Sequence, residues 1–166
     1  MKKILTVLLL SLVITAGLFA FDGSTSASFA YSYDGNHYLG ISSESIGFFN
    51  NSNFGYYGSA DALFNVKSIN DWKIDMLVGP VYRYSFDESG VKVNIAVGAS
   101  AAGTNDKFSF GIGSYIGANW SFAEHFGFTI GTKLGSNFVE LPYNGNSLSV
   151  KGDFYVTPLI GVNFYY

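Results

Sequence analysis

Bulky apolar and small polar residues alternate along most of this chain, and this period of two constrains its fold more than any other feature. Successive side chains of a β-strand point to opposite faces, so strict alternation predicts strands with one apolar and one polar face. The pattern is clearest in residues 72–86 and recurs in residues 91–102, 107–122 and 126–136. In the first of these runs, the apolar positions are Trp72, Ile74, Met76, Val78, Pro80, Tyr82, Tyr84 and Phe86.

Turn-like clusters, most of them rich in glycine, asparagine, aspartate and serine, interrupt the alternation. They lie at residues 34–36, 50–53, 68–71, 87–90, 103–106, 123–125 and 137–147. The runs between them predict eight strands: residues 25–33, 37–49, 54–67, 72–86, 91–102, 107–122, 126–136 and 148–166. The sequence therefore predicts an all-β fold of antiparallel neighbouring strands.

The two faces of these strands differ in bulk and in charge. From residue 54 onward, the apolar face carries no charged residue, and the other face is rich in glycine, serine, asparagine and alanine. A bulky exterior suits lipid and a small polar interior suits a narrow lumen. In hydrocarbon every backbone group needs a partner, so such a sheet must close on itself. We therefore predict a closed antiparallel eight-stranded transmembrane β-barrel.

A soluble, lipocalin-like barrel with the aromatic face around a ligand is the alternative, because alternation alone does not say which face is inside. Its exterior would be glycine-rich and sparsely charged, which is a poorly solvated surface. Charged residues make up 13% of the chain, against about 25% in ordinary soluble domains. The membrane barrel is the favoured interpretation.

Two features depart from regular alternation. The apolar positions of residues 37–49 change phase between Ile41 and Ile46, which predicts either a bulge near residues 43–45 or a strand whose bounds are misplaced. Pro80 and Pro158 lie inside predicted strands although proline cannot donate to a ladder. We expect local bulges at both prolines.

Residues 1–20 are expected to be a cleaved signal peptide. Lys2 and Lys3 precede an apolar run from Ile4 to about Leu18, and small residues lie near its end. The rival interpretation, a permanent anchor helix, is less favoured because the run is short for a membrane span. The remaining domain, residues 21–166, is then the barrel.

Charge and residue content exclude several function classes. The chain has no cysteine, which excludes disulfides, thiolate metal sites and a cysteine nucleophile. A net charge of −3 offers no basic patch for nucleic acid. No group of histidines and carboxylates has metal-ligand spacing, and the glycine pairs lie within strands rather than in a phosphate loop. We expect membrane lipid as a partner and no nucleic acid, cofactor or metal.

Eight charged residues on the polar face are the candidate site. An eight-stranded barrel is about filled by its own side chains, and charges out of water must pair. We therefore expect a structural network in the lumen, with a narrow channel for small solutes as the alternative. Its members are Asp61, Lys73, Asp75, Arg83, Lys92, Lys133, Lys151 and Asp153.

A lipid-modifying enzyme is a second alternative, and it would need a histidine-based site near a rim. Only His37 and His125 are available. His37 lies in a predicted turn near Asp34, Ser42 and Ser43, which is also the ordinary composition of a turn. An even number of strands places both ends of the barrel at one rim, which we expect to face the periplasm. His125 lies in a predicted turn at that rim, on the wrong side for chemistry on the outer leaflet. We expect a structural or surface-interaction role and no enzymatic activity.

The end of the chain carries apolar residues at alternate positions and an aromatic last residue: Ile160, Val162, Phe164 and Tyr166. This pattern resembles the C-terminal assembly signal of outer-membrane proteins. With the signal peptide, the chain is similar to the small eight-stranded barrel superfamily that includes OmpX, OmpW and the OmpA membrane domain. The resemblance implies an outer-membrane location and insertion by the outer-membrane assembly machinery. The predicted loops are shorter than is common in those families.

Overall fold

Eight antiparallel strands form the whole of the regular structure in this computed structural model, which describes residues 23–86, 89–144 and 148–166. The predicted signal peptide lies outside the described residues. In the part of the chain that is described, no helix is long and apolar enough to cross a membrane. The strands are β1 (Gly23–Tyr33), β2 (His37–Phe48), β3 (Phe54–Asn65), β4 (Trp72–Phe86), β5 (Val91–Thr104), β6 (Lys107–Ser121), β7 (Phe126–Pro142) and β8 (Ser149–Tyr165).

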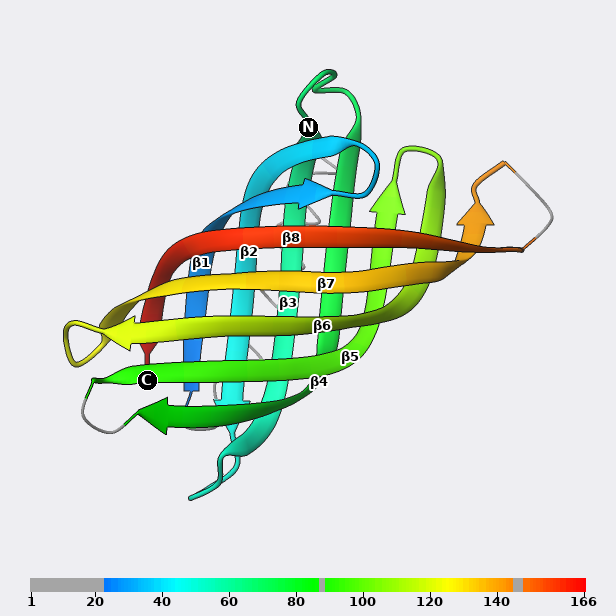
Figure 1. The fold of residues 1–166 in the computed structure, drawn as a ribbon. Helices are drawn as coiled ribbons and strands as arrows, with labels where there is room; N and C mark the ends of the chain where they lie inside the picture. Colours follow the sequence, from blue (N-terminus) through cyan, green and yellow to red (C-terminus); the bar gives the residue numbers. More distant parts are fainter. Residues whose placement is uncertain (1–22, 87–88, 145–147) are drawn as a thin grey trace.

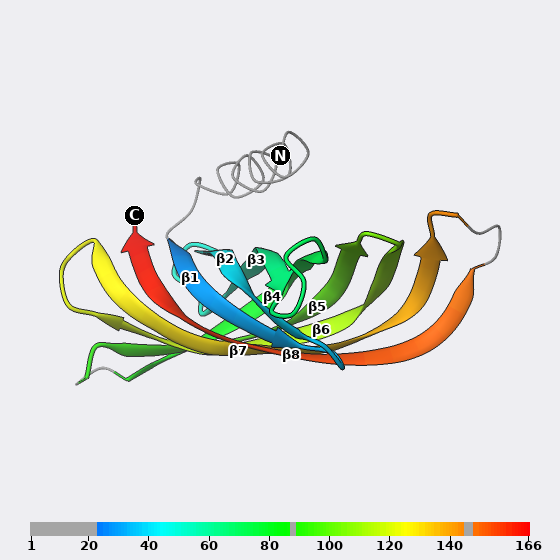
Figure 2. The ribbon, with the colours of Figure 1, turned by 90° about the horizontal axis from the view of Figure 1, so that it is seen from above.

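The sheet closes because β1 pairs with β8 as well as with β2. At the seam, the backbone N–H of Gly23 donates to the carbonyl of Tyr166, and that of Tyr166 donates to the carbonyl of Gly23. Figure 1 shows the strongly tilted strands, and Figure 2 shows β6, β7 and β8 curving round the barrel. We call the end with Gly23 and Tyr166 the termini rim, and the end with the β1–β2 and β7–β8 connections the loop rim. The predicted closed eight-stranded barrel is confirmed.

The bulky apolar face is the exterior, as predicted. Ile112 on β6 is 62% exposed, whereas Gly113 beside it is buried in the lumen. A ligand-enclosing barrel with the aromatic face inside is therefore wrong for this chain. Other strongly exposed residues on the exterior are Phe29, Ile41, Val78, Val97, Trp120, Phe128, Ile130, Phe154 and Ile160.

The bulge predicted near residues 43–45 is wrong. β1 and β2 pair in one unbroken register from Gly23 opposite Gly47 to Tyr33 opposite His37. Ile41 points outward, while Ile46 is 3% exposed and points into the lumen. The apolar residues change face because Ile46 and Phe48 belong to an apolar cluster that packs inside the lumen toward the termini rim.

The bulges predicted at the two prolines are also wrong. The β4–β5 register is the same on both sides of Pro80, but pairing is interrupted between Val78 and Val81. The β1–β8 register likewise continues past Pro158, with pairing interrupted between Val156 and Leu159. Each proline lies at a position where its strand is not paired with one of its two neighbours. The N–H that proline lacks is therefore not missed in that ladder.

The real irregularity lies at the loop rim, around Phe138 of β7. The β6–β7 register shifts between Phe110 and Gly111, and the β7–β8 register shifts between Asn137 and Val139. The extra residue lets both Asn137 and Glu140 face the lumen, where both are buried. β7 therefore continues through residues 137–142, which the sequence predicted as loop.

Candidate functional site

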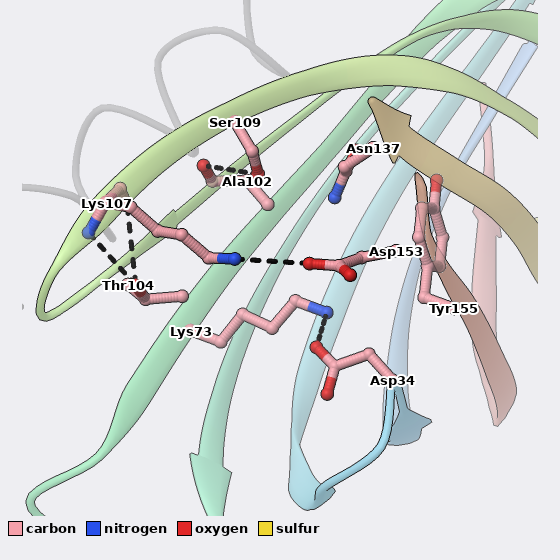
Figure 3. A pocket seen from close by; sticks show the side chains of 9 residues that line it. All are labelled: Asp34, Lys73, Ala102, Thr104, Lys107, Ser109, Asn137, Asp153 and Tyr155. Carbon is pink, nitrogen blue, oxygen red and sulfur yellow. Dashed lines mark hydrogen bonds and ion pairs between the residues drawn. The ribbon is translucent and has the colours of Figure 1, made fainter. Parts of the chain in front are cut away.

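The loop-rim half of the lumen holds two groups of ion pairs around a small cavity (Figure 3). The Lys73 ammonium lies 2.7 Å from a carboxylate oxygen of Asp34, in the β1–β2 turn, and 3.0 Å from one of Asp75. Lys107 pairs with buried Glu140 and lies 3.2 Å from Asp153. The cavity between them measures about 30 Å³. Pockets for organic ligands are roughly 300–1,000 Å³, so this cavity has room for water and not for an organic solute.

Lys133 spans the lumen below this cavity and connects opposite walls. Its ammonium, from β7, lies 2.5 Å from Asp61 Oδ1 on β3 and donates a 2.9 Å hydrogen bond to Ser42 Oγ on β2. The Lys133 and Asp61 side chains are 3% and 2% exposed. A buried ion pair with an extra hydroxyl partner fixes the distance between the two walls.

Glu44 extends this network toward the termini rim. Ser26 Oγ donates a 2.7 Å hydrogen bond to one carboxylate oxygen, and Tyr57 Oη donates a 2.9 Å hydrogen bond to the other. Glu44 is buried, and its partners come from β1 and β3. The carboxylate therefore ties three neighbouring strands to one point inside the lumen.

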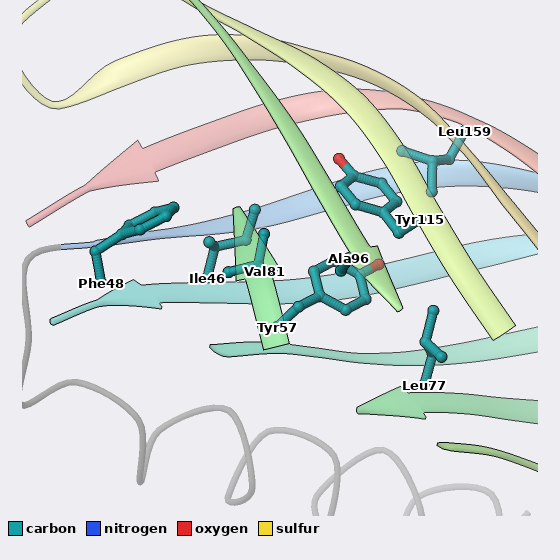
Figure 4. Packing of buried hydrophobic residues seen from close by; sticks show 8 residues of the cluster. All are labelled: Ile46, Phe48, Tyr57, Leu77, Val81, Ala96, Tyr115 and Leu159. Carbon is teal, nitrogen blue, oxygen red and sulfur yellow. The ribbon is translucent and has the colours of Figure 1, made fainter. Parts of the chain in front are cut away.

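Below the ion pairs, eight apolar side chains pack together inside the lumen, and we call them the apolar plug (Figure 4). Its side chains come from β2, β3, β4, β5, β6 and β8, so they meet across the barrel. The rings of Tyr57 and Tyr115 are stacked, with centroids 4.6 Å apart and planes 18° apart. The plug consists of Ile46, Phe48, Tyr57, Leu77, Val81, Ala96, Tyr115 and Leu159.

Lumen-facing glycines leave the room that these rings occupy. A Cβ atom at Gly117 would lie 2.0 Å from the Tyr115 hydroxyl, and one at Gly131 would lie 2.8 Å from the Tyr115 ring. Both distances are far below van der Waals contact. The glycine-rich polar face of the sequence is thus explained in part by close packing of the lumen.

The structure brings together five of the eight predicted lumen charges and leaves three apart. Asp61, Lys73, Asp75 and Lys133 are buried, and Asp153 joins the loop-rim group through Lys107. The other three lie elsewhere: Arg83 lies 3.5 Å from the centre of the Phe48 ring, Lys92 lies 5.4 Å from that of Tyr165, and Lys151 is exposed.

Four members of the network were not singled out from the sequence: Asp34, Glu44, Lys107 and Glu140. Asp34 and Glu140 fell in predicted loops, and Glu44 fell in the apparent phase change of β2. Ser42, Glu44, Ile46 and Phe48 occupy alternate positions and all face the lumen. Because two of them are polar and two are apolar, the sequence pattern does not identify them as one face of a strand.

The residues considered for an enzyme do not assemble. Tyr31 Oη lies 2.5 Å from His37 Nδ1 at the loop rim, whereas Ser42 is buried in the lumen on the other face of β2. Ser43 shares the outward face but lies six residues along the strand, roughly 20 Å away. His125 Nδ1 lies 3.2 Å from the Tyr165 carbonyl at the termini rim. Among the described residues, no three His, Cys, Asp or Glu side chains form a metal site.

We expect Lys133→Met to destabilise the folded barrel by about 3–5 kcal/mol, because it leaves Asp61 buried without its cation. Urea unfolding in phospholipid vesicles measures this loss. Adding Asp61→Asn should recover part of it, as a double-mutant cycle would show. Lys151→Met, at an exposed lysine, is the matched control and should change stability by less than about 0.5 kcal/mol. A Lys133→Met barrel as stable as the wild type would contradict the role of the cross-lumen pair.

No protein-family model and no curated protein matches this chain. Solved structures do match it. Neisserial surface protein A aligns with a TM-score of 0.62 and 11% identity over 87% of this chain and 96% of that one. OprG from Pseudomonas aeruginosa gives 0.59 and 11%, over 89% and 96%. Ail, the attachment invasion locus protein of Yersinia pestis, gives 0.51 and 14%, over 87% and 97%.

These neighbours are small eight-stranded outer-membrane barrels, and they match over nearly their whole length. The predicted outer-membrane localisation agrees with them. At these identities the likeness is one of fold. The chain has the fold of the small eight-stranded outer-membrane β-barrels.

Proposed function

We propose that this protein is an integral outer-membrane barrel with a closed lumen, whose role is structural and surface-interacting rather than transport. The observation that carries the proposal is the apolar plug, which crosses the lumen from six strands and includes the stacked Tyr57 and Tyr115 rings. A path for ions needs continuous water, and a packed apolar layer excludes water. We assign no catalytic role to His37 or His125.

The raised β7–β8 hairpin supports the surface role. Pairing of β8 with β1 stops at Val156, so Ser149–Tyr155 extends past the end of β1 at the loop rim. Val150 is 77% exposed and Phe154 is 60% exposed on this extension. Lys107, Glu140 and Asp153 brace it from the lumen side. Exposed apolar groups on a braced hairpin are suited to contact with a partner.

The orientation completes the proposal: the termini rim faces the periplasm and the loop rim faces the cell exterior. The fold is compatible with a contact role there, since the same architecture carries Ail, a protein named for attachment. We further propose that Ile160, Val162, Phe164 and Tyr166 form the strand that the outer-membrane assembly machinery recognises. In the folded barrel Phe164 and Tyr166 are exposed at the termini rim.

Planar-bilayer recording separates the closed barrel from a narrow channel. We expect the wild-type protein to show no steady conductance. Combining Tyr57→Ala with Tyr115→Ala removes the stacked rings and should open a measurable conductance. Tyr56→Ala, at the neighbouring position on the other face of β3, is the matched control and should stay closed. Steady conductance of the wild type would overturn the closed-lumen proposal.

Cysteine labelling on intact cells tests the orientation, since the chain has no cysteine of its own. We expect Val150→Cys to react with a membrane-impermeant maleimide on intact cells, and Ala123→Cys at the termini rim to react only after the cells are broken. The reverse pattern would contradict the proposed orientation.

The same assay tests the C-terminal strand. Deleting Tyr165 and Tyr166 in the Val150→Cys chain should abolish labelling on intact cells while leaving most folding into detergent, where no machinery is needed. Asn163→Ser, at a lumen-facing position of the same strand, is the control and should keep most of the labelling. Equal labelling of the truncated and full-length chains would show that these residues are no assembly signal.

A further inference from the structure

The part of β8 at the loop rim has one free edge. Residues 150–154 pair with β7 on one side, where Val150 lies opposite Val139. On the other side, pairing with β1 stops at Val156, and none of the described residues takes the place of β1 beyond it. Figure 1 shows β8 continuing past the end of β1. We call residues 150–154 the β8 edge.

The β8 edge is open to a second strand. A row of backbone N–H and C=O groups with no neighbour is a template for another strand, and the alternate side chains decide which strand fits. All five residues of the β8 edge are exposed. At its centre, a Cβ atom on Gly152 would lie 3.9 Å from the nearest atom, Ser136 Oγ, so the approach is clear.

The sequence of the β8 edge is complementary to a second copy of itself. In an antiparallel pair centred on Gly152, Lys151 lies opposite Asp153 of the second copy, and Val150 lies opposite its Phe154. Two-fold symmetry makes each of these contacts occur twice. Val150 and Phe154 are 77% and 60% exposed, so the apolar pairs also remove apolar surface from water. Opposite charges and apolar side chains that lie directly opposite each other stabilise antiparallel strands.

The charges of the β8 edge select this register. Charged side chains at an edge normally oppose pairing with another chain. Because alternate residues point to opposite faces, the register can shift only by two residues. A shift by two would put Lys151 opposite Lys151, or Asp153 opposite Asp153, of the second copy. Asp153 lies 3.2 Å from Lys107 of its own chain, yet its side chain is 48% exposed and can accept a second cation.

We propose that two copies of this protein pair through their β8 edges, loop rim to loop rim. The two-fold axis of an antiparallel pair runs perpendicular to the sheet, and the sheet here stands along the barrel wall. The two barrels therefore point in opposite directions, and the contact joins barrels in two facing membranes. The proposal rests on the surface-interacting role proposed above and identifies the partner as a second copy.

Disulfide trapping between lipid nanodiscs that each hold one barrel tests this contact, since such barrels meet only across solvent. The chain has no cysteine of its own. We expect Gly152→Cys to cross-link to its own counterpart, in about tenfold greater yield than Val66→Cys, because a disulfide needs Cα atoms within about 7 Å. Val66 is 58% exposed near the loop rim and lies outside the hairpin. Equal yields at the two positions would indicate random collision and would overturn the proposal.

Charge reversal in the Gly152→Cys chain separates the register from a loss of fold. Lys151→Asp alone and Asp153→Lys alone each put like charges opposite each other at two places and should lower the yield about tenfold. A mixture of the two variants should restore the yield to within about twofold, because opposite charges then meet at both places. A yield that stays low in the mixture, while both variants keep the compact unboiled gel form, would refute the pairing.

The surface role is measured separately from the identity of the partner. If Val150→Cys is labelled on intact cells but Gly152→Cys gives no cross-link between nanodiscs, the surface role stands and its partner is not a second copy. If the cross-link forms but Val150→Cys is not labelled on intact cells, the pairing of the edges stands and the proposed orientation is wrong.

Discussion

The pairing of every backbone group in a closed ring is the constraint on which the rest of this structure depends. Hydrocarbon offers no hydrogen-bond partners, so a spanning sheet with a free edge would leave a row of unsatisfied N–H and C=O groups. Here the seam between β1 and β8 removes that edge through the span. Beyond Val156, β8 rises past the end of β1 and is no longer paired with it. That stretch is also where exposed apolar side chains gather on a raised hairpin.

Closure then decides what the lumen must be. Eight strands enclose a space that is about filled by side chains. In this chain those side chains form an apolar cluster in one half and ion pairs in the other. The termini half receives an apolar plug, and the loop-rim half receives ion pairs that join β7 to β3 and the β1–β2 turn to β4. Buried ion pairs are weak evidence for net stability, because desolvation offsets much of the attraction. Their clearer contribution is to fix which walls face each other, since removal of one partner leaves a buried charge.

The period of two in the sequence predicted most of the strands and their faces. Residues 107–122 and 126–136 alternate without a break, and the structure has strands there with the predicted faces. The alternation failed where the lumen is apolar, because Ile46 and Phe48 then resemble lipid-facing residues. It also missed residues 137–142, since a bulge at Phe138 interrupts the period and the following residues are turn-like. Bulges and apolar lumen layers depend on which strands meet across the barrel, and a single run of sequence does not contain that information.

The candidate network was predictable in part for the same reason. Lys73, Asp75 and Lys133 stand in long regular strands, so their face could be assigned from their neighbours. The choice of partner could not, because Lys133 reaches Asp61 from another strand across the lumen. Lys107 and Glu140 lie at the loop rim, where strand ends are set by pairing and not by local pattern.

Lipid contact of isoleucine methyl groups tests the central claim most directly, namely that one closed sheet sorts lipid-facing from lumen-filling residues. The measurement is NMR of the methyl-labelled protein in nanodiscs that contain a doxyl label on the acyl chains. It needs no substitution. We expect strong broadening of the methyl signals of Ile41, Ile112, Ile130 and Ile160, and a preserved signal from Ile46 although it shares β2 with Ile41. Equal broadening of Ile41 and Ile46, or protection of Ile112 and Ile130, would contradict the central claim.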